Sequence, residues 1–262
     1  MKYCRFEHNG IPQFGLIETI AGREEITWTL SSVPDKSAPD SGSTKISPVP
    51  LGDANLLPAT DASKIVCIGR NYREHAAELG NEVPPEPLIF LKPPSSLLAP
   101  GKAIVLPGIS ARVDHEAELG VVIGKKCRNL RDDEDVRPYV LGYTCVNDVT
   151  ARDLQRKDGQ WTRGKGFDTF CPVGPVVVDD IDPWAGVDVE ARVNGNVKQR
   201  GNTRDFIFAL DVVIRFIAQV MTLLPGDLIA TGTPSGVGPL AAGNVVEVSV
   251  AGIGTLRNPV SK

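Results

Sequence analysis

Short runs of β-branched and apolar residues recur along most of this chain, each bounded by glycine or proline. Runs of this length and composition are typical of buried strands. Only two good helical patterns interrupt them, Tyr72–Leu79 and Thr203–Leu223. So few crossover helices argue against a doubly wound sheet and predict a mainly β, α+β fold of the roll or barrel-like sandwich type. The runs are Ile65–Ile68, Leu88–Leu91, Ala103–Leu106, Glu118–Ile123, Val173–Val178, Val187–Val193, Leu228–Thr231 and Val245–Val250.

The first 55 residues differ in character from the rest. Residues 1 to about 30 alternate polar and apolar side chains around Asn9-Gly10, a dipeptide that two-residue hairpin turns prefer. Ser31–Pro50 then contains six serines and four prolines with few apolar side chains, which is typical of a loop or linker. We therefore expect a small β-rich N-terminal domain with a Pro/Ser-rich linker over residues 1–55, and a larger domain over residues 56–262.

The composition is that of an ordinary globular protein. With 262 residues, 42% of them hydrophobic, the chain can bury a full core. The formal net charge is −4 and the basic residues are scattered, so we expect neither nucleic acid nor a membrane surface as a partner. Five cysteines without a C-x-x-C pair argue against a disulfide framework or a thiolate zinc site and favour a reducing cytoplasm.

No segment has the pattern of a targeting or membrane-spanning sequence. The N-terminus is charged and lacks the apolar stretch of a signal peptide, so we expect none. The longest apolar run, Phe206–Leu224, is interrupted by Asp211, Arg215 and Gln219, whose spacing places them in one stripe along a helix. We expect this run to pack on a core rather than to cross a bilayer.

Three carboxylates lie in stretches that otherwise read as buried strand. Glu116 and Glu118 belong to the run Val113–Gly124, and Asp148 follows another apolar run. Side chains i and i+2 of a strand share a face about 6.6 Å apart, and two like charges there are costly unless a cation lies between them. An all-oxygen ligand set favours Mg²⁺, Mn²⁺ or Ca²⁺ over Zn²⁺. From spacing alone, a solvated face with glutamates paired to lysines explains the pattern equally well.

The segment Gly69–Leu79 follows a short apolar strand and predicts a helix with His75 and Glu78 on one face. A carboxylate beside an imidazole orients the ring and raises its basicity, as a general base requires. An exposed helical ion pair is the commoner meaning of such spacing and stays open. The Pro-rich segment Gly80–Pro87 that follows is either a lid or a plain surface connection.

Two lysines, one polar triplet and one glycine-rich turn complete the candidates. Lys92 ends an apolar strand and Lys165 lies in a glycine-flanked turn; each suits a substrate carboxylate or a developing enolate, although a surface lysine is commoner. Asp148, Arg152 and Gln155 share one face if a helical turn begins at Asp148, which would otherwise be an N-cap. The turn Ala230–Gly238 can hold an anion with its N–H groups but lacks the spacing of a nucleotide-binding loop.

In combination these motifs resemble the fumarylacetoacetate hydrolase superfamily over residues 65 to about 258. Each motif is weak alone, whereas six of them in order at compatible spacings are specific. The matching segments are Gly69–Tyr72 with His75 and Glu78, Phe90–Pro93, His115–Gly120, Asn147–Asp153, Lys165 and Thr231–Gly238.

The resemblance implies a mixed β-roll domain, a homodimer and a divalent metal, Mg²⁺ or Mn²⁺, with Ca²⁺ able to take the same site in crystals. It assigns four kinds of role by position. The metal ligands fall on Glu116, Glu118 and Asp148, the catalytic dyad on His75 and Glu78, the active-site lysine on Lys165, and the substrate contacts on Arg70, Tyr72, Lys92, Arg152, Gln155 and Thr233.

The resemblance also implies a reaction. A 3-acylpyruvate, a 2,4-dioxo acid such as fumarylpyruvate or acetylpyruvate, would be cleaved by water through the enolate of pyruvate. The same enolate chemistry serves oxaloacetate decarboxylation or isomerisation of a 2-hydroxyhepta-2,4-diene-1,7-dioate. Retention of His75 and Glu78 favours hydrolysis, since only that reaction needs an activated water. A non-catalytic protein that binds a 2-oxo acid, or a structural domain with paired carboxylates, is the further alternative.

Overall fold

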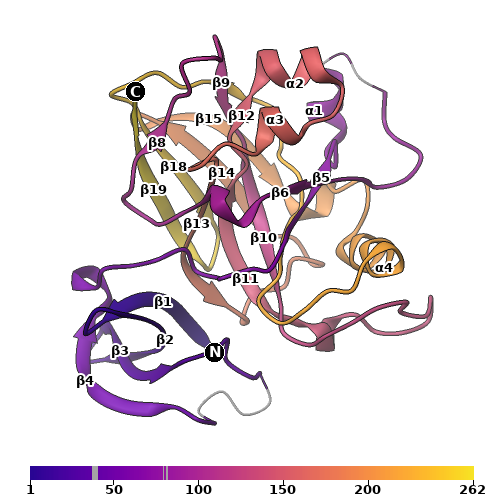
Figure 1. The fold of residues 1–262 in the computed structure, drawn as a ribbon. Coiled ribbons are helices and arrows are strands. Elements are labelled where there is room, and N and C mark those ends of the chain that lie inside the picture. The colour runs from indigo at the N-terminus through magenta and orange to yellow at the C-terminus, as the bar shows by residue number, and fades with distance from the viewer. Residues whose placement is uncertain (37–40, 79, 81) are drawn as a thin grey trace.

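The structure is a computed structural model that describes residues 1–36, 41–78, 80 and 82–262. Strands in three sheets are the main regular structure in this part of the chain, and short helices lie at its periphery (Figure 1). The largest sheet has the order β4-β3-β2-β1-β13-β11-β10-β16-β5-β6, with β7 added beside β13. The mainly β, α+β fold expected from the sequence is therefore confirmed.

The N-terminal strands form an antiparallel meander at one end of the largest sheet. Asn9 and Gly10 both have positive φ, 52° and 77°, and join the first two strands as the predicted hairpin turn. The meander is continuous with the rest of the sheet because Tyr3 pairs with Val177. Its strands are β1 (Lys2–His8), β2 (Ile11–Ile20), β3 (Arg23–Leu30) and β4 (Thr44–Pro50).

The prediction of a linker over Ser31–Pro50 is wrong in its second half, because β4 pairs with β3 from Thr44 to Pro50. The strand lies at the edge of the sheet, where a proline without an N–H costs no ladder hydrogen bond. Lys45 also lies over the ring of Trp28, 5.6 Å from its centroid. Residues 37–40 of the predicted linker lie outside the described residues.

The central strands of the largest sheet are nearly all buried. Most neighbours are antiparallel, but β16 runs parallel to β5, so the sheet is mixed. This arrangement places the start of β10 beside the end of β11, since Ala117 pairs with Asn147. The strands are β5 (Ile65–Gly69), β6 (Leu88–Lys92), β7 (Leu97–Leu98), β10 (Ala117–Ile123), β11 (Val140–Asn147), β13 (Cys171–Val178) and β16 (Leu228–Ala230).

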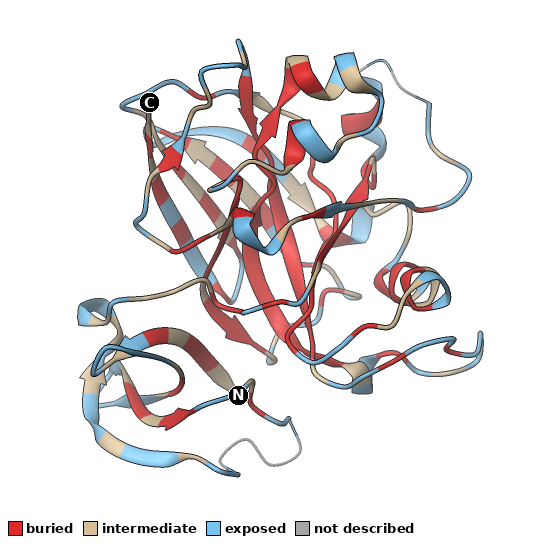
Figure 2. Cartoon of the chain, in the orientation of Figure 1, coloured by how far each residue is buried: buried red, intermediate tan, exposed pale blue. Residues whose placement is uncertain are grey.

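A second sheet packs against the first, and one hydrophobic core joins them. Val121 and Cys145 of the first sheet lie in the same buried cluster as Ala191, Val248 and Leu256 of the second, which Figure 2 shows as a buried interior. The second sheet contains β15 (Asn196–Asn202), β14 (Asp188–Val193), β18 (Val245–Val250), β19 (Gly254–Ser261) and β8 (Ile104–Val105), and a small third sheet contains β12 (Thr150–Ala151), β9 (Val113–His115) and β17 (Gly238–Pro239).

The helices are short. The predicted helix Thr203–Leu223 is wrong at its start, because only residues from Leu210 to Val220 are α-helical. The side chain of Asn71 accepts a hydrogen bond from the N–H of Phe208 and donates one to the carbonyl of Phe208, which fixes the backbone just before α4 outside the helix. None of the helices in the described residues is long and apolar enough to cross a membrane. The helices are α1 (Arg73–Glu78), α2 (Arg152–Asp158), α3 (Thr162–Lys165) and α4 (Leu210–Val220), and 3₁₀ turns cover Leu51–Asp53, Pro94–Ser96, Arg137–Tyr139 and Thr203–Asp205.

Candidate metal centre and active site

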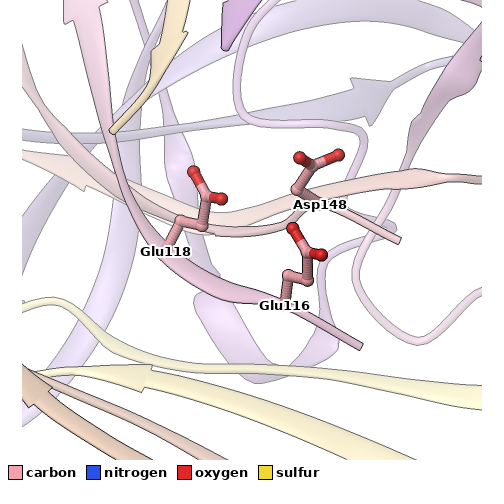
Figure 3. A group of neighbouring side chains, drawn as sticks. All are labelled: Glu116, Glu118 and Asp148. Carbon is pink, nitrogen blue, oxygen red and sulfur yellow. The ribbon is translucent and has the colours of Figure 1, made fainter. Parts of the chain in front are cut away.

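Two antiparallel strands bring the three predicted acidic residues together. Glu116 and Glu118 stand at the start of β10 with Ala117 between them, and Asp148 follows the end of β11. One carboxylate oxygen from each lies within 4.8 Å of the others, and the three side chains point toward one another in Figure 3. All three are buried, being 4%, 2% and 1% exposed. The interpretation of the glutamates as a solvated face is therefore wrong, whereas their expected common side is confirmed.

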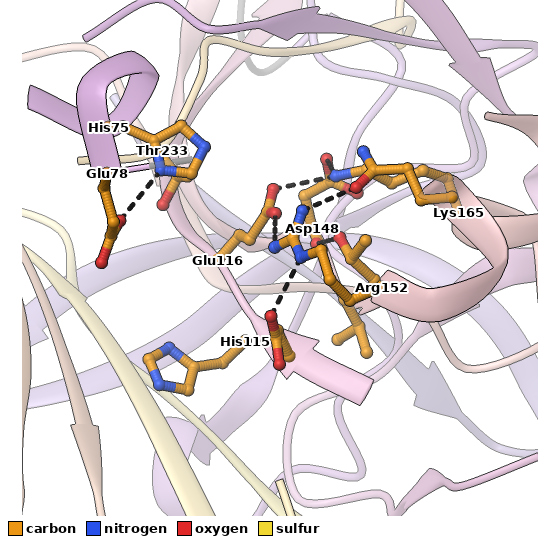
Figure 4. A network of polar contacts seen from close by, with 12 residues as sticks. His75, Glu78, His115, Glu116, Asp148, Arg152, Lys165 and Thr233 are labelled. Atoms are coloured by element: carbon orange, nitrogen blue, oxygen red, sulfur yellow. Dashed lines mark hydrogen bonds and ion pairs between the residues drawn. The ribbon is translucent and has the colours of Figure 1, made fainter. Parts of the chain in front are cut away.

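Cations surround two of these carboxylates. Lys165 donates to Glu116 at 2.8 Å and to Asp148 at 2.5 Å, and Lys92 donates to the other oxygen of Asp148 at 2.6 Å. Arg152 donates to the second oxygen of Glu116 (Figure 4). Burial acts to raise the pKa of Glu116, but the charges of Lys165 and Arg152 outweigh it and hold that pKa below its usual range.

Glu118 is in a different position. In the described part of the chain no cationic side chain forms an ion pair with it, and its hydrogen bond comes from the backbone N–H of Gly232 at 2.8 Å. Burial, followed by the charges of Asp148 and Glu116, raises the pKa of Glu118 well above its usual range. A buried carboxylate without a cation beside two others is the situation that a bound divalent ion relieves. Glu116, Glu118 and Asp148 thus form an acidic set with the oxygen donors that Mg²⁺ and Mn²⁺ prefer.

The predicted dyad, His75 and Glu78, lies on α1 at the edge of the same site. His75 Nδ1 is 3.4 Å from Glu78 Oε2 on α1, and the imidazole is almost fully buried (Figure 4). Burial lowers the pKa of His75 below 6.5, with partial compensation from Glu116 and Glu78. At neutral pH the ring is therefore uncharged and able to accept a proton. The N–H of Gly236 donates to both oxygens of Glu78, at 3.1 and 3.2 Å.

A single cavity of 360 Å³ unites most of the predicted residues. Its walls also include Phe90 and Trp161, whose rings meet edge to face at 5.1 Å, and Arg156 at the mouth, none of which the sequence indicated. These aromatic rings give the cavity an apolar surface next to the charged residues, because Lys165 Nζ lies over the ring of Phe90, 5.0 Å from its centroid. The predicted residues that line it are Arg70, His75, Glu116, Glu118, Asp148, Arg152, Gln155, Lys165 and Thr233.

Three predicted residues do not line this cavity. Lys92 lies behind Asp148 and is 1% exposed, with a second hydrogen bond to the carbonyl of Val149 at 3.1 Å. Tyr72 is buried against Phe206 and lines a separate cavity, and its hydroxyl has no hydrogen-bond partner among the described residues. Glu78 reaches the site only through His75.

The polar triplet and the glycine-rich turn also differ from expectation. Asp148 is neither part of a helix nor its N-cap, because Thr150 and Ala151 form β12 and α2 begins at Arg152. Arg152 and Gln155 nevertheless meet in the site, with a hydrogen bond of 2.7 Å. The anions that the glycine-rich turn holds through its N–H groups are Glu118 and Glu78 of this same chain.

Asp114 is a buried site residue that sequence reasoning missed. It is completely buried and accepts hydrogen bonds from Arg152 at 2.9 Å and from Arg112 at 2.8 Å. It precedes Glu116 by two residues, so the alternation that drew attention to the two glutamates extends one step further back. The signal was present, but an acid next to a histidine before the apolar run also reads as a surface position.

The fold and this acidic centre define a class of metal-site β-roll proteins, and comparisons with known proteins identify the family. Residues 64–261 match the family described as fumarylacetoacetate (FAA) hydrolase, C-terminal. The chain belongs to that family, whose members include hydrolases, decarboxylases and isomerases. This confirms the resemblance drawn from the sequence motifs.

Three relatives illustrate the range. The chain is 38% identical to a 2,4-didehydro-3-deoxy-L-rhamnonate hydrolase of Sphingomonas sp., in an alignment that covers 100% of this chain and 96% of the relative. It is 48% identical to a mitochondrial oxaloacetate decarboxylase of Dictyostelium discoideum over 73% of this chain and 90% of the relative. The crystal structure of 5-carboxymethyl-2-hydroxymuconate delta-isomerase from Mycobacterium smegmatis superposes with a TM-score of 0.88 and 40% identity, covering 100% of this chain and 99% of that one.

Proposed function

We propose that this protein is a divalent-metal-dependent hydrolase that cleaves the carbon–carbon bond of a 3-acylpyruvate, a 2,4-dioxo acid of the fumarylpyruvate or acetylpyruvate type. The observation that carries the proposal is that His75 lines the same 360 Å³ cavity as Glu116, Glu118 and Asp148. A proton acceptor and a set of metal-type ligands on opposite walls can act on the two ends of one small substrate.

Glu116, Glu118 and Asp148 would hold Mg²⁺ or Mn²⁺, because their donor atoms are all carboxylate oxygens and no cationic side chain of the described residues forms an ion pair with Glu118. When bound, such an ion supplies a Lewis acid for the carboxylate and 2-oxo oxygens of the substrate. Arg152 and Lys165 face the same cavity with charged donors, and they orient the pyruvate half of the substrate. The rings of Phe90 and Trp161 offer an apolar surface against which the acyl half can pack.

The proton transfers follow from the dyad. Neutral His75 removes one proton from a water, and the oxygen of that water bonds to carbon 4 of the substrate. The bond between carbons 3 and 4 then breaks, and its electron pair remains on carbon 3 as the enolate of pyruvate. The acyl fragment leaves as a carboxylic acid, and a proton delivered to carbon 3 completes pyruvate. Glu78 keeps the imidazole oriented through its contact with Nδ1.

Lys165 suits the enolate step. Burial opposes its charge, but Asp148 and Glu116 raise the pKa of its ammonium above its usual value, so it stays protonated. A fixed positive charge at the cavity wall stabilises negative charge that develops on the substrate without any reorganisation.

Two relatives support this reaction and its alternative. The Sphingomonas relative is named as a hydrolase of a 2,4-didehydro-3-deoxy sugar acid, a name that denotes oxo groups at carbons 2 and 4 around an unsubstituted carbon 3. The Dictyostelium relative is named as an oxaloacetate decarboxylase, a reaction that needs the enolate half of the site but no activated water. Oxaloacetate decarboxylation, or isomerisation of a 2-hydroxy-dienedioate, is therefore the second candidate.

Turnover measurements separate these reactions. Acetylpyruvate, fumarylpyruvate, oxaloacetate and a 2-hydroxy-dienedioate are each incubated with Mg²⁺, with Mn²⁺ and with EDTA, while pyruvate release and the enol absorbance are followed. We expect metal-dependent pyruvate release from an acylpyruvate. Activity on oxaloacetate or the dienedioate alone would move the assignment to a decarboxylase or an isomerase. Binding of a 2-oxo acid without turnover would leave a binding protein.

We also propose a homodimer, on the family resemblance alone. Light scattering coupled to size-exclusion chromatography tests it, and a mass near 28.1 kDa would contradict it.

A further inference from the structure

Gln199 is a buried side chain in an otherwise exposed edge strand. It lies in β15, the outermost strand of the second sheet, between exposed Lys198 and Arg200. Gln199 itself is 1% exposed. A buried amide must satisfy its donors and acceptors, so its partners show what it holds in place.

All four hydrogen-bonding positions of this amide are filled. Its oxygen accepts from the backbone N–H of Ala117 at 2.9 Å and lies 3.0 Å from Nδ1 of His115. Its nitrogen donates to the hydroxyl of Thr233 and to the carbonyl of Pro234, both at 2.7 Å. Because the N–H of Ala117 can only donate and the carbonyl of Pro234 can only accept, the orientation of the amide is fixed.

These bonds satisfy backbone groups of β10 that β16 does not reach. On one side of β10, β16 pairs only with residues 120–122, so the backbone of Ala117 extends past the end of that ladder. The side-chain oxygen of Gln199 accepts a hydrogen bond from the N–H of Ala117, and the hydroxyl of Thr233 donates to the carbonyl of Ala117 at 2.8 Å. Ala117 separates Glu116 from Glu118, so this closed ring of three residues sets the direction in which both carboxylates leave the backbone.

The backbone of β15, the strand that carries Gln199, also contacts the glycine-rich turn. A Cβ on Gly236 would lie 2.0 Å from the carbonyl oxygen of Lys198, and one on Gly201 would lie 2.6 Å from Pro234, so turn and strand are in close contact. This turn supplies the N–H of Gly232 to Glu118 and the N–H of Gly236 to Glu78. The contact between β15 and the glycine-rich turn thus influences both Glu118 and Glu78.

We infer that Gln199 is a positioning residue for the metal centre. It acts on Glu116 and Glu118 through the backbone of Ala117 and through Thr233, and it does not itself line the cavity. No nearby sequence pattern marks it. Its effect is therefore expected in the affinity for a divalent ion, which depends on how accurately Glu116 and Glu118 are directed.

The test uses Gln199→Met, which keeps the length of the side chain and removes its hydrogen bonds, and Arg200→Gln, an exposed neighbour in the same strand, as control. Calorimetric titration of EDTA-treated protein with Mn²⁺ measures affinity, and thermal unfolding of the metal-free protein measures stability. We expect the Mn²⁺ dissociation constant of Gln199→Met to rise about 10- to 100-fold, with the control unchanged. Thr233→Val should weaken binding in the same direction, and the double variant should lose less than the sum.

Two results would overturn the inference. One is an unchanged Mn²⁺ affinity in folded Gln199→Met, even if its melting temperature falls, since that pattern describes a purely structural residue. The other is full additivity with Thr233→Val, since the two side chains would then act independently. If Gln199→Met does not fold, Gln199→Leu takes its place, because it also removes the acceptor for Ala117 and both donors; normal affinity there overturns the inference equally. Absence of Mn²⁺ binding by the unaltered protein would remove the metal centre as well.

Discussion

The two walls of the cavity are built in opposite ways. On one wall Glu116, Asp148, Arg152 and Lys165 are at most 4% exposed and joined by short ion pairs. On the other, His75 is supported by Glu78, which lies outside the cavity lining, leaves 32% of its side chain exposed and approaches His75 only to 3.4 Å. The first wall combines the ends of two strands of a packed sheet, which carry Glu116 and Asp148, with Arg152 of α2 and Lys165 of α3, whereas the second lies on the six-residue helix α1.

This difference separates what each wall can tolerate. Charges inside a protein are stable only as a balanced set, so removing one partner leaves another buried and unpaired. Exposed pairs are screened by water and contribute little to stability. We therefore expect substitutions on the buried wall to affect folding or metal binding, and substitutions on the helical wall to affect proton transfer alone. Figure 4 shows both walls together.

The largest effect is expected from Glu118→Gln. The amide keeps an acceptor for the N–H of Gly232 but removes a metal-type donor, so Mg²⁺ and Mn²⁺ binding should be lost. Lewis-acid stabilisation of several kcal/mol corresponds to a fall in kcat/KM of about 10³-fold or more. The metal-free protein should melt no lower than the original, because a buried charge without a cation has been removed. Calorimetry measures metal binding and thermal unfolding measures stability. Retained metal binding would refute the assignment of Glu118 as a metal ligand. As a control, EDTA treatment of the original protein should reproduce the fall in kcat/KM.

His75→Ala tests the opposite wall. Acylpyruvate hydrolysis should fall about 10²- to 10⁴-fold, the usual contribution of a general base, while the metal affinity and melting temperature change little. Any decarboxylation of oxaloacetate should survive, since it needs no activated water. Parallel assays on the two substrates give the comparison. Equal loss of both activities would show that His75 does not serve water activation.

Arg152→Ala is the next in size and should act mainly on stability. Arg152 joins Asp114 and Glu116, so its removal leaves two buried carboxylates with fewer partners. We expect the free energy of unfolding to fall by about 3 to 5 kcal/mol. Arg163→Ala removes an exposed ion pair from the adjacent helix and should lower the free energy of unfolding far less, because water screens that pair. Urea unfolding of both variants gives the comparison, and similar losses would contradict the view of the buried wall as one balanced set.

Much of this site could be predicted from the sequence, because its chemistry follows local patterns. The alternation of Glu116 and Glu118 on an apolar strand indicated a common face, and their shared cluster with Asp148 is confirmed. The runs of β-branched residues likewise located eight strands to within one or two residues, although β15, β19 and the short strands β7, β12 and β17 were missed.

Other features depend on contacts that are distant in sequence. The start of α4 is set by Asn71, which binds the backbone of Phe208 from 137 residues away. The strand β4 contains prolines that suit a linker equally well, and only its edge position makes them acceptable. Gln199 looks like a surface residue of an exposed strand until the fold places it against Ala117. None of these tertiary hydrogen bonds produces a periodic pattern in the sequence.

The smallest effect is expected from Glu78→Gln, and its direction follows from the electrostatics of His75. Burial lowers the pKa of His75, and Glu78 partly restores it by its hydrogen bond and its charge. Activity requires the neutral ring, so the rate falls as the pH drops through this pKa. Without the charge of Glu78 the pKa is lower still, and the acid limb of kcat/KM should move to lower pH. A weaker base also reduces the plateau, by less than about tenfold. Glu74→Gln, an exposed carboxylate of the same helix that meets Ser235, is the matched control and should leave the pH profile in place. A shift of the acid limb to higher pH in Glu78→Gln would mean that the carboxylate does not interact with the protonated ring as the geometry indicates.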